Sequence, residues 1–402
     1  MKIIVQKYGG SSLATSELIK RIADKVIETK NSGYEAVVVV SALGDTTDHL
    51  VELSKSITKN PPRREMDMLL SVGEHISISL IAMALNEKGY PAVSFTGSQA
   101  GIITTPDHTD ARILEIKSDR IQKELQEGKI IVIAGYQGVS TQDEITTLGR
   151  GGSDTTAVAL SAALGAERCE IMTDVDGIYT ANPNKITGAQ LIPELSHDEM
   201  LDLAELGSQV LKSSAVEFAK RHNINIHVGS SFSGKIGTIV TNNVLDRNRT
   251  TGIVIDDDTI LVKLTNGSRK SYLSCILNLA REGISVRYLW QDDQICKFIA
   301  KAEDLSNVKK IVDSQEENIL LSIGEKITLV SVVGTGINFK SDIMTKVLSI
   351  LDDMNISPET YSFSETRISI GLQKKYVNDV ASNLHQTLIL QNSYAKVEDG
   401  EI

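Results

Sequence analysis

The stretch TLGRGGSDTTAVAL, from Thr147 to Leu160, carries the strongest structural signal in the sequence. Its glycine-rich centre, residues 149–152, predicts a tight turn, because glycine adopts backbone conformations that other residues avoid. A helix of small residues is expected directly after the turn, from Ala157 to Gly165. Ser153 or Asp154 is suited to cap that helix through a side-chain oxygen. A capped helix after a tight turn therefore explains every residue of the stretch except its arginine.

Arg150 stands between the glycines of this turn. Its guanidinium, the oriented amides of the turn and the carboxylate of Asp154 would all lie at one point. Such a point suits an anionic substrate that faces a nucleotide, because the repulsion between the two anions has to be neutralised. The turn therefore predicts phosphoryl transfer from a nucleotide to a small acid.

A second glycine turn, Lys7-Tyr8-Gly9-Gly10-Ser11-Ser12, follows the first expected strand and precedes a helix. Consecutive glycines let the backbone approach a ligand closely, and free N–H groups at a helix start can hold phosphate oxygens. Lys7 would add a positive charge for a transferring phosphoryl group. An ordinary Gly-Gly turn fits the same residues, so this motif alone leaves both interpretations open.

The chain has 402 residues, too many for one ordinary hydrophobic core, so two or three domains are expected. With 41% hydrophobic and 23% charged residues, its composition is typical of globular proteins and not of disordered ones. The net charge of −11 argues against nucleic acid as a partner, because proteins that bind a phosphate backbone concentrate positive charge. A nucleotide stays compatible with this charge, since it needs only local donors.

The sequence also argues against a membrane as a partner. The longest mainly apolar run, Val37–Leu43, suits a buried strand and not a bilayer span. The apolar start, Ile3–Val5, is too short for a signal peptide. The three cysteines, Cys169, Cys275 and Cys296, form no CxxC pair, and we expect them to be reduced thiols of a cytoplasmic protein.

Short β-branched runs alternate with helical stretches in the first part of the chain. The expected strands are Ile3–Lys7, Ala36–Ser41, Ile130–Ala134, Cys169–Thr173 and Ile224–Val228. The expected helices are Ser16–Asn31, Val72–Lys88, Asp110–Glu127 and His197–His222. The spacing of Ile76, Leu80 and Met83 supports the second of these helices. This alternation predicts an α/β fold with a mainly parallel sheet, in which ligands gather at the carboxyl ends of the strands.

A polar stretch, Thr241–Asp258, ends this pattern and predicts a domain boundary. An internal repeat follows, which carries Ile284 onto Ile356, 72 positions later. Each copy predicts a small α+β unit of strand, helix, two strands, helix and strand. Two such units are either generic ferredoxin-like domains or effector-binding domains, and the tandem arrangement behind a larger domain favours regulation.

Three other features of the sequence give weaker evidence about function. Gly229–Lys235 (GSSFSGK) nearly matches a phosphate-binding P-loop, but no hydroxyl residue follows its lysine, so we interpret it as a loop. Gly334-Thr335-Gly336 lacks the third glycine of a dinucleotide fingerprint. Glu74 opens an apolar helix, where it either favours the helix dipole or receives the ammonium group of a substrate.

These pieces, in this order, resemble the aspartokinases of the amino-acid kinase family. The resemblance covers nearly the whole chain and rests on VQKYGGSS, VVVVSALGDTTDHLV, REMDMLLSVGEHISISLIAMAL, ITTLGRGGSDTTAVALSAAL, CEIMTDVDGIYTANP and VLKSSAVEFAK. It implies an amino-acid-kinase αβα sandwich over residues 1–242, followed by two ferredoxin-like ACT domains over residues 256–324 and 325–402. The implied activity is transfer of the γ-phosphoryl group of MgATP to the side-chain carboxylate of L-aspartate. The product would be 4-phospho-L-aspartate, the first intermediate towards lysine, threonine and methionine.

The resemblance also assigns roles position by position. Lys7 resembles the lysine that stabilises the transferring phosphoryl group, and Asp154 the carboxylate that organises it. The positions that resemble nucleotide-binding residues are Lys7, Gly9, Gly10, Ser11, Thr173, Asp174, Tyr179, Lys185, Gln209 and Lys212. Those that resemble substrate-binding residues are Ser41, Thr47, Glu74, Arg150 and Ser153. Magnesium would arrive with ATP, so no metal ligand is implied in the protein itself.

The chain departs from the family pattern at the nucleotide turn. The family usually has Asp-Pro-Arg where this chain has Asn182-Pro183-Asn184, so an arginine is missing and Lys185 is the candidate substitute. Gln209 stands where many members have lysine, and Lys212-Ser213-Ser214 replaces a basic segment. These changes bear on nucleotide affinity more than on the identity of the substrate.

Four residues of the first ACT unit are candidate effector contacts: Asn266, Ser285, Arg287 and Gln291. Arg287 stands where the family typically has aspartate, and a guanidinium there would repel the cationic groups of lysine. We therefore expect lysine to inhibit weakly or not at all, unless Arg287 turns into solvent and the effector binds elsewhere. Paired ACT units further imply a homodimer or a higher homo-oligomer.

The sequence leaves two other functions open. One is a divergent amino-acid kinase of specialised metabolism that acts on a related small amino acid, or a feedback-insensitive paralogue. The other is a regulatory subunit that binds ligands without turnover. The presence of Lys7, Arg150 and Asp154 argues against the subunit, whereas the missing arginine at the nucleotide turn argues weakly for it.

Overall fold

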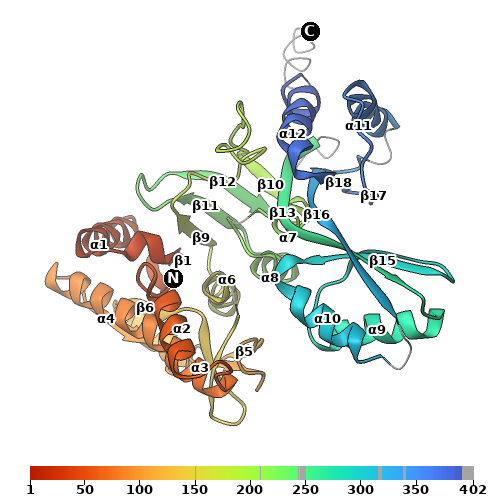
Figure 1. The fold of residues 1–402 in the computed structure, drawn as a ribbon. Helices are drawn as coiled ribbons and strands as arrows, with labels where there is room; N and C mark the ends of the chain where they lie inside the picture. The colour runs from red at the N-terminus through yellow and green to blue at the C-terminus, as the bar shows by residue number, and fades with distance from the viewer. Residues whose placement is uncertain are drawn as a thin grey trace, which may run out of the picture. The chain divides into compact units, whose positions relative to one another are not determined.

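The computed structural model describes residues 1–149, 151–208, 210–242, 244, 250–315, 319–337 and 341–391 (Figure 1). The chain folds into two compact units. The first comprises Met1–Ile178, Leu191–Ala204 and Gln209–Leu245, and the second comprises Tyr179–Gln190, Glu205–Ser208 and Asp246–Ile402. The segment Tyr179–Gln190 therefore belongs to the second unit, although its sequence neighbours on both sides belong to the first.

An eight-stranded sheet forms the centre of the first unit, in the order β10-β12-β11-β9-β1-β2-β6-β3. Its strands are β1 (Ile3–Tyr8), β2 (Glu35–Val40), β3 (Ala92–Phe95), β6 (Ile130–Ala134), β9 (Arg168–Thr173), β10 (Glu194–Ser196), β11 (Ile226–Ser230) and β12 (Ile236–Thr241). Every neighbouring pair is parallel except β11 and β12. A second sheet has the order β5-β4-β7-β8 and consists of β4 (Ile102–Thr104), β5 (Ile113–Ile116), β7 (Gln137–Ser140) and β8 (Ile145–Thr147).

Helices cover both faces of the large sheet. The helical elements of this unit are η1 (Gly10–Leu13), α1 (Ser16–Asn31), α2 (Thr46–Ile57), α3 (Arg63–Leu70), α4 (Val72–Glu87), α5 (Asp119–Gln126), α6 (Gly152–Leu164), α7 (His197–Glu205) and α8 (Ser213–His222). Helix α1 begins where the Thr15 hydroxyl accepts a hydrogen bond from the Leu18 N–H. Figure 1 shows α1 and α4 on one side of the sheet and α6 and α8 on the other. The predicted αβα sandwich with a mainly parallel sheet is confirmed.

Two predicted helices are wrong in part. Within Asp110–Glu127, residues 113–116 form β5, which pairs antiparallel with β4, and only Asp119–Gln126 is helical. The spacing of apolar residues does not reveal such a distant strand partner. Within His197–His222, helix α7 ends at Glu205 and α8 begins at Ser213. Gly207 lies between them with a φ of +122°, which a helix cannot contain.

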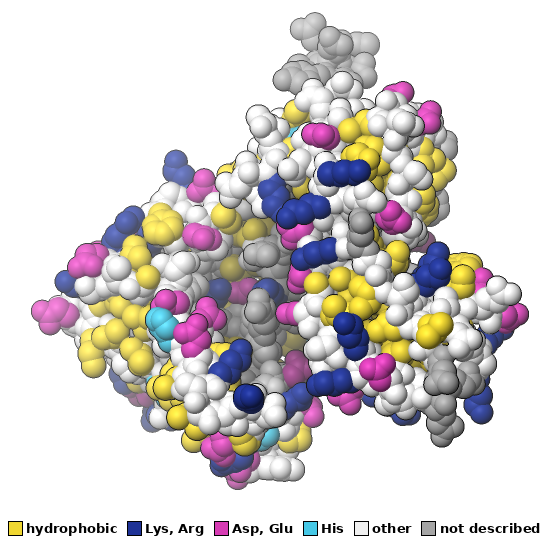
Figure 2. Space-filling model, in the orientation of Figure 1, with side chains coloured by type: hydrophobic (Ala, Val, Ile, Leu, Met, Phe, Trp, Pro, Cys, Tyr) yellow, Lys and Arg dark blue, Asp and Glu magenta, His cyan; other side chains and the backbone are white. Residues whose placement is uncertain are grey.

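Helix α4 forms as predicted but buries a different face. Ile78 and Ile81 lie in the core with α1 and the sheet. Ile76, Leu80 and Met83, whose spacing supported the helix, are instead exposed. Figure 2 shows hydrophobic side chains gathered on the surface over this helix. The periodicity of the sequence is therefore correct for the element and does not identify its buried side.

One helical stretch among the described residues, Arg63–Glu87, is long and apolar enough to cross a membrane by length and composition alone. It spans α3, Ser71 and α4. In its most apolar window 50% of the residues are buried inside the structure, as in a core helix, so the stretch is weak evidence for a membrane span.

The second unit is built on an antiparallel sheet in the order β14-β15-β13-β16-β18-β17. Its elements are β13 (Thr250–Thr265), α9 (Arg269–Arg281), β14 (Arg287–Gln291), β15 (Ile295–Lys301), η2 (Ala302–Asp304), α10 (Leu305–Asp313), β16 (Leu320–Gly334), α11 (Ser341–Asp353), β17 (Thr360–Phe363), β18 (Arg367–Gln373), η3 (Lys374–Tyr376), α12 (Val377–His385) and a π-helical turn η4 (Gln386–Leu390).

The internal repeat is present in this unit. In the first copy, α9 ends with two hydrogen bonds, from the Gly283 N–H to Ala280 O and from the Ile284 N–H to Leu279 O. In the second copy, α11 ends with the same two bonds 72 residues later, from the Asn355 N–H to Asp352 O and from the Ile356 N–H to Leu351 O. Gly283 and Asn355 both have positive φ, at 74° and 53°, as expected after a helix end.

The two copies share their long strands, which the sequence did not predict. Residues 259–265 of β13 pair with β16 within the first copy, whereas residues 250–256 pair with residues 329–334 of β16. No strand follows α12 within residues 377–391, so the first half of β13 takes the place of the last strand in the second copy. The predicted boundaries at 256 and 325 therefore fall inside β13 and β16, and the division into three domains stays a prediction.

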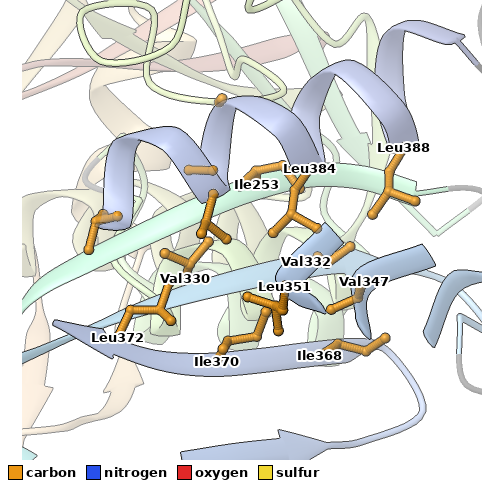
Figure 3. Close-up of a cluster of buried hydrophobic side chains, with 14 of the residues drawn as sticks. Ile253, Val330, Val332, Val347, Leu351, Ile368, Ile370, Leu372, Leu384 and Leu388 are labelled. Atoms are coloured by element: carbon orange, nitrogen blue, oxygen red, sulfur yellow. The ribbon is translucent and has the colours of Figure 1, made fainter. Parts of the chain in front are cut away.

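The second copy has its own hydrophobic core, which Figure 3 shows between α12 and the sheet. Ile253 of β13 packs there with Val330 of β16, Ile370 of β18 and Leu384 of α12. Ala181 and Ile186, from the short segment 179–190, belong to the same cluster. This cluster explains why the segment belongs to the second unit.

Candidate active site

Close backbone contacts gather several predicted residues at the carboxyl edge of the large sheet. A Cβ on Gly10, just after β1, would lie 2.7 Å from the carbonyl oxygen of Ala42, just after β2. A Cβ on Gly73, at the start of α4, would lie 2.7 Å from the Ala42 Cβ. A Cβ on Gly135, just after β6, would lie 2.6 Å from Ser153 Oγ in α6. Only glycine allows these approaches, so both predicted glycine motifs lie at one edge.

Lys7 and Asp154 form an ion pair at this edge, with 2.7 Å between Lys7 Nζ and Asp154 Oδ1. Their side chains are only 13% and 8% exposed. The sequence predicted that Ser153 or Asp154 caps α6, and this prediction is wrong. The capping position is Gly151, in a left-handed conformation with a φ of 81°, and no side chain bonds there. Asp154 lies in the first turn of the helix, where its carboxylate contacts the lysine instead.

Glu74 is a buried carboxylate with one unused oxygen. Its side chain is 3% exposed, and Oε1 accepts a hydrogen bond of 3.0 Å from the Ala42 N–H. Oε2 is buried and has no hydrogen-bond partner among the residues that the structure describes. Burial raises the pKa of Glu74 from 4.5 to about 8, against the opposing effect of the Ala42 N–H. A ligand that brings a cation would satisfy this oxygen.

The other predicted substrate residues lie as follows. Ser41 directly follows β2, and its N–H donates to the Tyr8 carbonyl oxygen at 3.2 Å. Thr47 is the second residue of α2 and is half-buried. Ser153 is buried against Gly135. Arg150 lies outside the described residues. The structure thus brings Ser41, Glu74 and Ser153 to the edge that holds Lys7.

The predicted phosphate turn continues β1 on the same edge. Gly9 and Gly10 follow the strand, Ser11 is exposed, and the buried Ser12 donates its hydroxyl hydrogen to Ser231 Oγ at 2.7 Å. Ser231 belongs to the GSSFSGK segment, whose first two residues end β11 and whose other residues form a loop as expected. The segment is therefore no P-loop, but it supports the phosphate turn, a role that the sequence did not reveal.

The predicted nucleotide residues divide between the two units. Thr173 ends β9, and its hydroxyl donates to Asp174 Oδ1 at 3.0 Å. Lys212 precedes α8, and a Cβ on Gly151 would lie 1.9 Å from Lys212 Cγ, so this side chain covers the start of α6. Tyr179 and Lys185 belong to the second unit.

Lys185 does not have a free ammonium group in this structure. Lys185 Nζ donates to Asp257 Oδ2 of β13 at 3.0 Å. The pair lies within the second unit. Gln209, the other departure of the nucleotide site, lies outside the described residues.

Tyr136 is a residue that the sequence did not single out. It follows β6 with a φ of 69°, and its carbonyl oxygen accepts a hydrogen bond of 2.8 Å from the Leu148 N–H. A Cβ on Gly152 would lie 3.0 Å from its ring, so Tyr136 borders the start of α6. Burial raises the pKa of Tyr136, and the nearby charge of Glu74 adds to the effect. The only signal in the sequence was its place after a predicted strand.

The four candidate effector residues lie at two ends of β14. Gln291 donates to the carbonyl oxygen of Arg269 at the start of α9, and Asn266, three residues before Arg269, is exposed. At the other end, Ser285 is exposed and Arg287 Nη2 lies 3.0 Å from Asp256 Oδ2. The Arg287 side chain is 19% exposed, so the alternative that it turns into solvent is wrong.

Comparison with known proteins places the chain in a family. The amino acid kinase family model matches residues 2–230, and an ACT domain model matches residues 330–388. The aspartokinase of Bacillus sp. (strain MGA3) is 43% identical over 411 residues, which cover 99% of this chain and 100% of that protein. Aspartokinase 2 of Bacillus subtilis (strain 168) is 40% identical over 403 residues, with 97% and 98% covered.

A solved structure agrees at the level of the fold. The crystal structure of E. coli aspartokinase III in complex with aspartate and ADP has a TM-score of 0.81 and 23% sequence identity, and covers 96% of this chain and 100% of that one. Because the sequence relatives match over nearly their full lengths, the chain belongs to the aspartokinase family of ATP-dependent phosphotransferases.

Proposed function

We propose that the edge around Lys7, Glu74 and Asp154 transfers the γ-phosphoryl group of MgATP to the side-chain carboxylate of L-aspartate. The observation that supports this most is the buried Oε2 of Glu74, which has no hydrogen-bond partner among the described residues. The ammonium group of an amino-acid substrate would bind this oxygen and stabilise the ionised carboxylate. The E. coli relative described above holds aspartate and ADP.

Lys7 and Asp154 would act on the phosphoryl group. In the transfer, an oxygen of the substrate carboxylate forms a bond to the γ-phosphorus while the bond to the ADP oxygen breaks, so no protein nucleophile is required. Lys7 Nζ neutralises charge on the transferring group, and Asp154, 2.7 Å away, fixes the ammonium in place. Such preorganised charges need no rearrangement during the reaction.

The nucleotide would bind along the ends of β1 and β9. Gly9, Gly10 and Ser11 would contact its phosphates, and Thr173 and Asp174 its other end. Lys212, beside Gly151, is the described lysine best placed to replace the missing basic residues. Tyr179, Lys185 and Gln209 stay in the proposal on the resemblance alone, since Lys185 is paired with Asp257.

Magnesium would be bound through the phosphates of ATP. Within the described residues, no three His, Cys, Asp or Glu side chains gather as a metal site.

The remaining parts of the proposal concern the whole chain: a kinase domain with two ACT domains, an amino-acid effector at the ACT domains, a homodimer or higher homo-oligomer, and a cytoplasmic location. Aspartate bound at Ser41, Thr47, Glu74, Arg150 and Ser153 completes it.

The role of Glu74 can be tested by comparing L-aspartate with succinate, which lacks the amino group. An ATP-dependent assay that traps the acyl phosphate with hydroxylamine measures both. In Glu74→Gln, the KM for aspartate should rise roughly tenfold to a hundredfold, because a hydrogen bond to a charged group is lost, whereas succinate should be little affected. Glu199→Gln, a change at another buried glutamate that binds Ser196, is the matched control. An unchanged preference for aspartate in Glu74→Gln would refute the assignment.

The KM for aspartate should also depend on pH through the ionisation of Glu74. The folded-state pKa of Glu74 is about 8, above its ordinary value of 4.5. Without ligand, Glu74 therefore keeps its proton over most of the range from pH 4.5 to 8. The stability that this protonated carboxyl contributes to the fold is lost as the pH rises through that range. Binding of an ammonium group requires the ionised form. The KM for aspartate should therefore fall as the pH rises from about 6 to 8 and then level off. A Glu74→Gln variant with the same pH profile would contradict this.

A further inference from the structure

Asp67 of α3 is a fully buried carboxylate outside the proposed site. Its carboxylate oxygens accept hydrogen bonds from two other segments, residues 108–109 and Thr147. Oδ1 accepts from the Thr147 hydroxyl at 2.5 Å and from the Thr109 N–H at 3.1 Å. Oδ2 lies 2.7 Å from His108 Nδ1 and 3.2 Å from the same Thr109 N–H. Asp67 is 0% exposed. A charge buried this deeply persists only with donors such as these.

The two segments that Asp67 holds meet at Gly149. Thr147 ends β8, and its carbonyl oxygen accepts a hydrogen bond of 2.9 Å from the Ala111 N–H. A Cβ on Gly149 would lie 3.2 Å from Asp110 Oδ1 and 3.4 Å from the Thr109 carbonyl oxygen. Thr109 has a φ of 69°, a strained conformation for a β-branched residue. Strain of this kind is maintained only where surrounding contacts enforce it, and here Asp67 provides them.

Thr147 connects Asp67 to the proposed aspartate site. The Tyr136 carbonyl oxygen accepts a hydrogen bond of 2.8 Å from the N–H of Leu148, the residue after Thr147, and the Tyr136 N–H donates to Thr156 Oγ1 of α6 at 3.2 Å. The Tyr136 ring borders Gly152 at the start of α6, and its pKa is raised by burial and further by the charge of Glu74. A chain of contacts thus runs from Asp67 through Thr147, Leu148 and Tyr136 to the start of α6.

We propose that Asp67 is a positioning residue for the substrate amino acid. Through Thr147 and Thr109 it holds residues 147–149 in the conformation from which α6, with Ser153 and Asp154, begins. This inference rests on the proposed function, because it assigns the start of α6 and Glu74 to aspartate. The ATP phosphates are assigned to the turn after β1, which Asp67 does not touch and which the start of α6 reaches through the pair of Asp154 with Lys7. The network therefore acts on the affinity for aspartate more than on that for ATP.

Three variants in the same small sheet test this. Thr147→Val removes the hydroxyl that binds Asp67 and keeps the shape, whereas Thr147→Ser keeps the hydroxyl. Thr104→Val removes the buried hydrogen bond of 2.5 Å between Thr104 and Thr146, which leads neither to Asp67 nor to Tyr136. Thr104 and Thr147 are both 0% exposed, so the two valine variants match in burial.

In steady-state assays, Thr147→Val should raise the KM for aspartate about tenfold and the KM for ATP much less, because the turn before α6 loses a hydrogen bond to a charged group that positions it. Thr147→Ser should stay within about twofold of the wild type, and so should Thr104→Val, even where its melting temperature falls. Calorimetric titration of the full chain with aspartate should show the same order of affinities. Asp67→Asn, which removes the charge and keeps the shape, should resemble Thr147→Val.

Two outcomes would overturn the inference. One is an equal rise in the KM for aspartate in Thr147→Val and Thr104→Val, and the other is a parallel rise in both KM values; each would make the network structural only. If the proposed function itself is wrong, the results will be different. In that case the wild type itself would not phosphorylate aspartate, or Glu74→Gln would bind it normally.

Discussion

At the scale of single residues, the site depends on charges removed from water. Lys7 and Asp154 are 147 positions apart in sequence and come together because β1 ends and α6 begins at the same edge. Glu74 owes its raised pKa to burial and not to a neighbouring charge. In both cases the chemistry of the residue is set by its surroundings, which makes substitutions at these positions affect folding as well as catalysis.

Lys7→Ala should therefore abolish turnover and also destabilise the fold. It leaves the carboxylate of Asp154, 8% exposed, without its cation, and breaking a buried pair costs about 3 kcal/mol. The double variant Lys7→Ala with Asp154→Asn should regain most of the stability and none of the activity. Urea unfolding and the hydroxylamine assay measure the two effects. A single variant as stable as the wild type would show that Asp154 does not depend on Lys7.

At the scale of elements, the turns at the sheet edge are set by how closely backbones approach. Gly10 packs against the loop after β2, and the Gly44 N–H donates to its carbonyl oxygen at 3.0 Å. The sequence predicted β1 and the glycine turn correctly, since both follow from local preference. It predicted a helix over residues 113–116, where β4 provides a strand partner instead.

Gly10→Ala should disrupt the phosphate turn, whereas Gly9→Ala should not disrupt folding. A Cβ on Gly10 would lie 2.7 Å and 2.9 Å from the carbonyl oxygens of Ala42 and Gly44, both backbone atoms that cannot yield locally. On Gly9 the nearest atom would be Lys7 Nζ at 3.6 Å, an ordinary contact, and its φ of −76° suits alanine. We expect Gly10→Ala to lose about 1–3 kcal/mol of stability and to raise the KM for ATP. Equal melting temperatures for the two variants would contradict this.

At the scale of the whole molecule, the second unit joins two repeated copies through shared strands. β13 contributes to both copies, and Asp256, at its midpoint, is a buried carboxylate that binds both Arg287 and Lys301. Arg287 is thus held in the structure by an ion pair, with a second cation on the same carboxylate. This group of three charged side chains carries a net positive charge at the end of β14.

We expect L-lysine to inhibit this enzyme weakly or not at all, because that positive charge disfavours a cationic effector nearby. Steady-state assays with lysine measure the effect, and potent inhibition at micromolar lysine would contradict it. Arg287→Asp should increase the sensitivity to lysine by reversing the local charge. Lys309→Asp, an equal change of charge at an exposed position of α10, is the control and should leave sensitivity unchanged.

The sequence by itself determined the order of most strands and helices, the two glycine turns, the repeat of 72 residues and the family, because these depend on local backbone preference and on motifs that are contiguous in the chain. Only the tertiary structure decided which residues meet. It paired Lys7 with Asp154 and Lys185 with Asp257, connected Asp67 to Thr147, and completed the second copy with the start of β13. It also left the Ile76 face of α4 exposed. These features depend on burial and on contacts between distant segments, and neither quantity is encoded in the spacing of neighbouring residues.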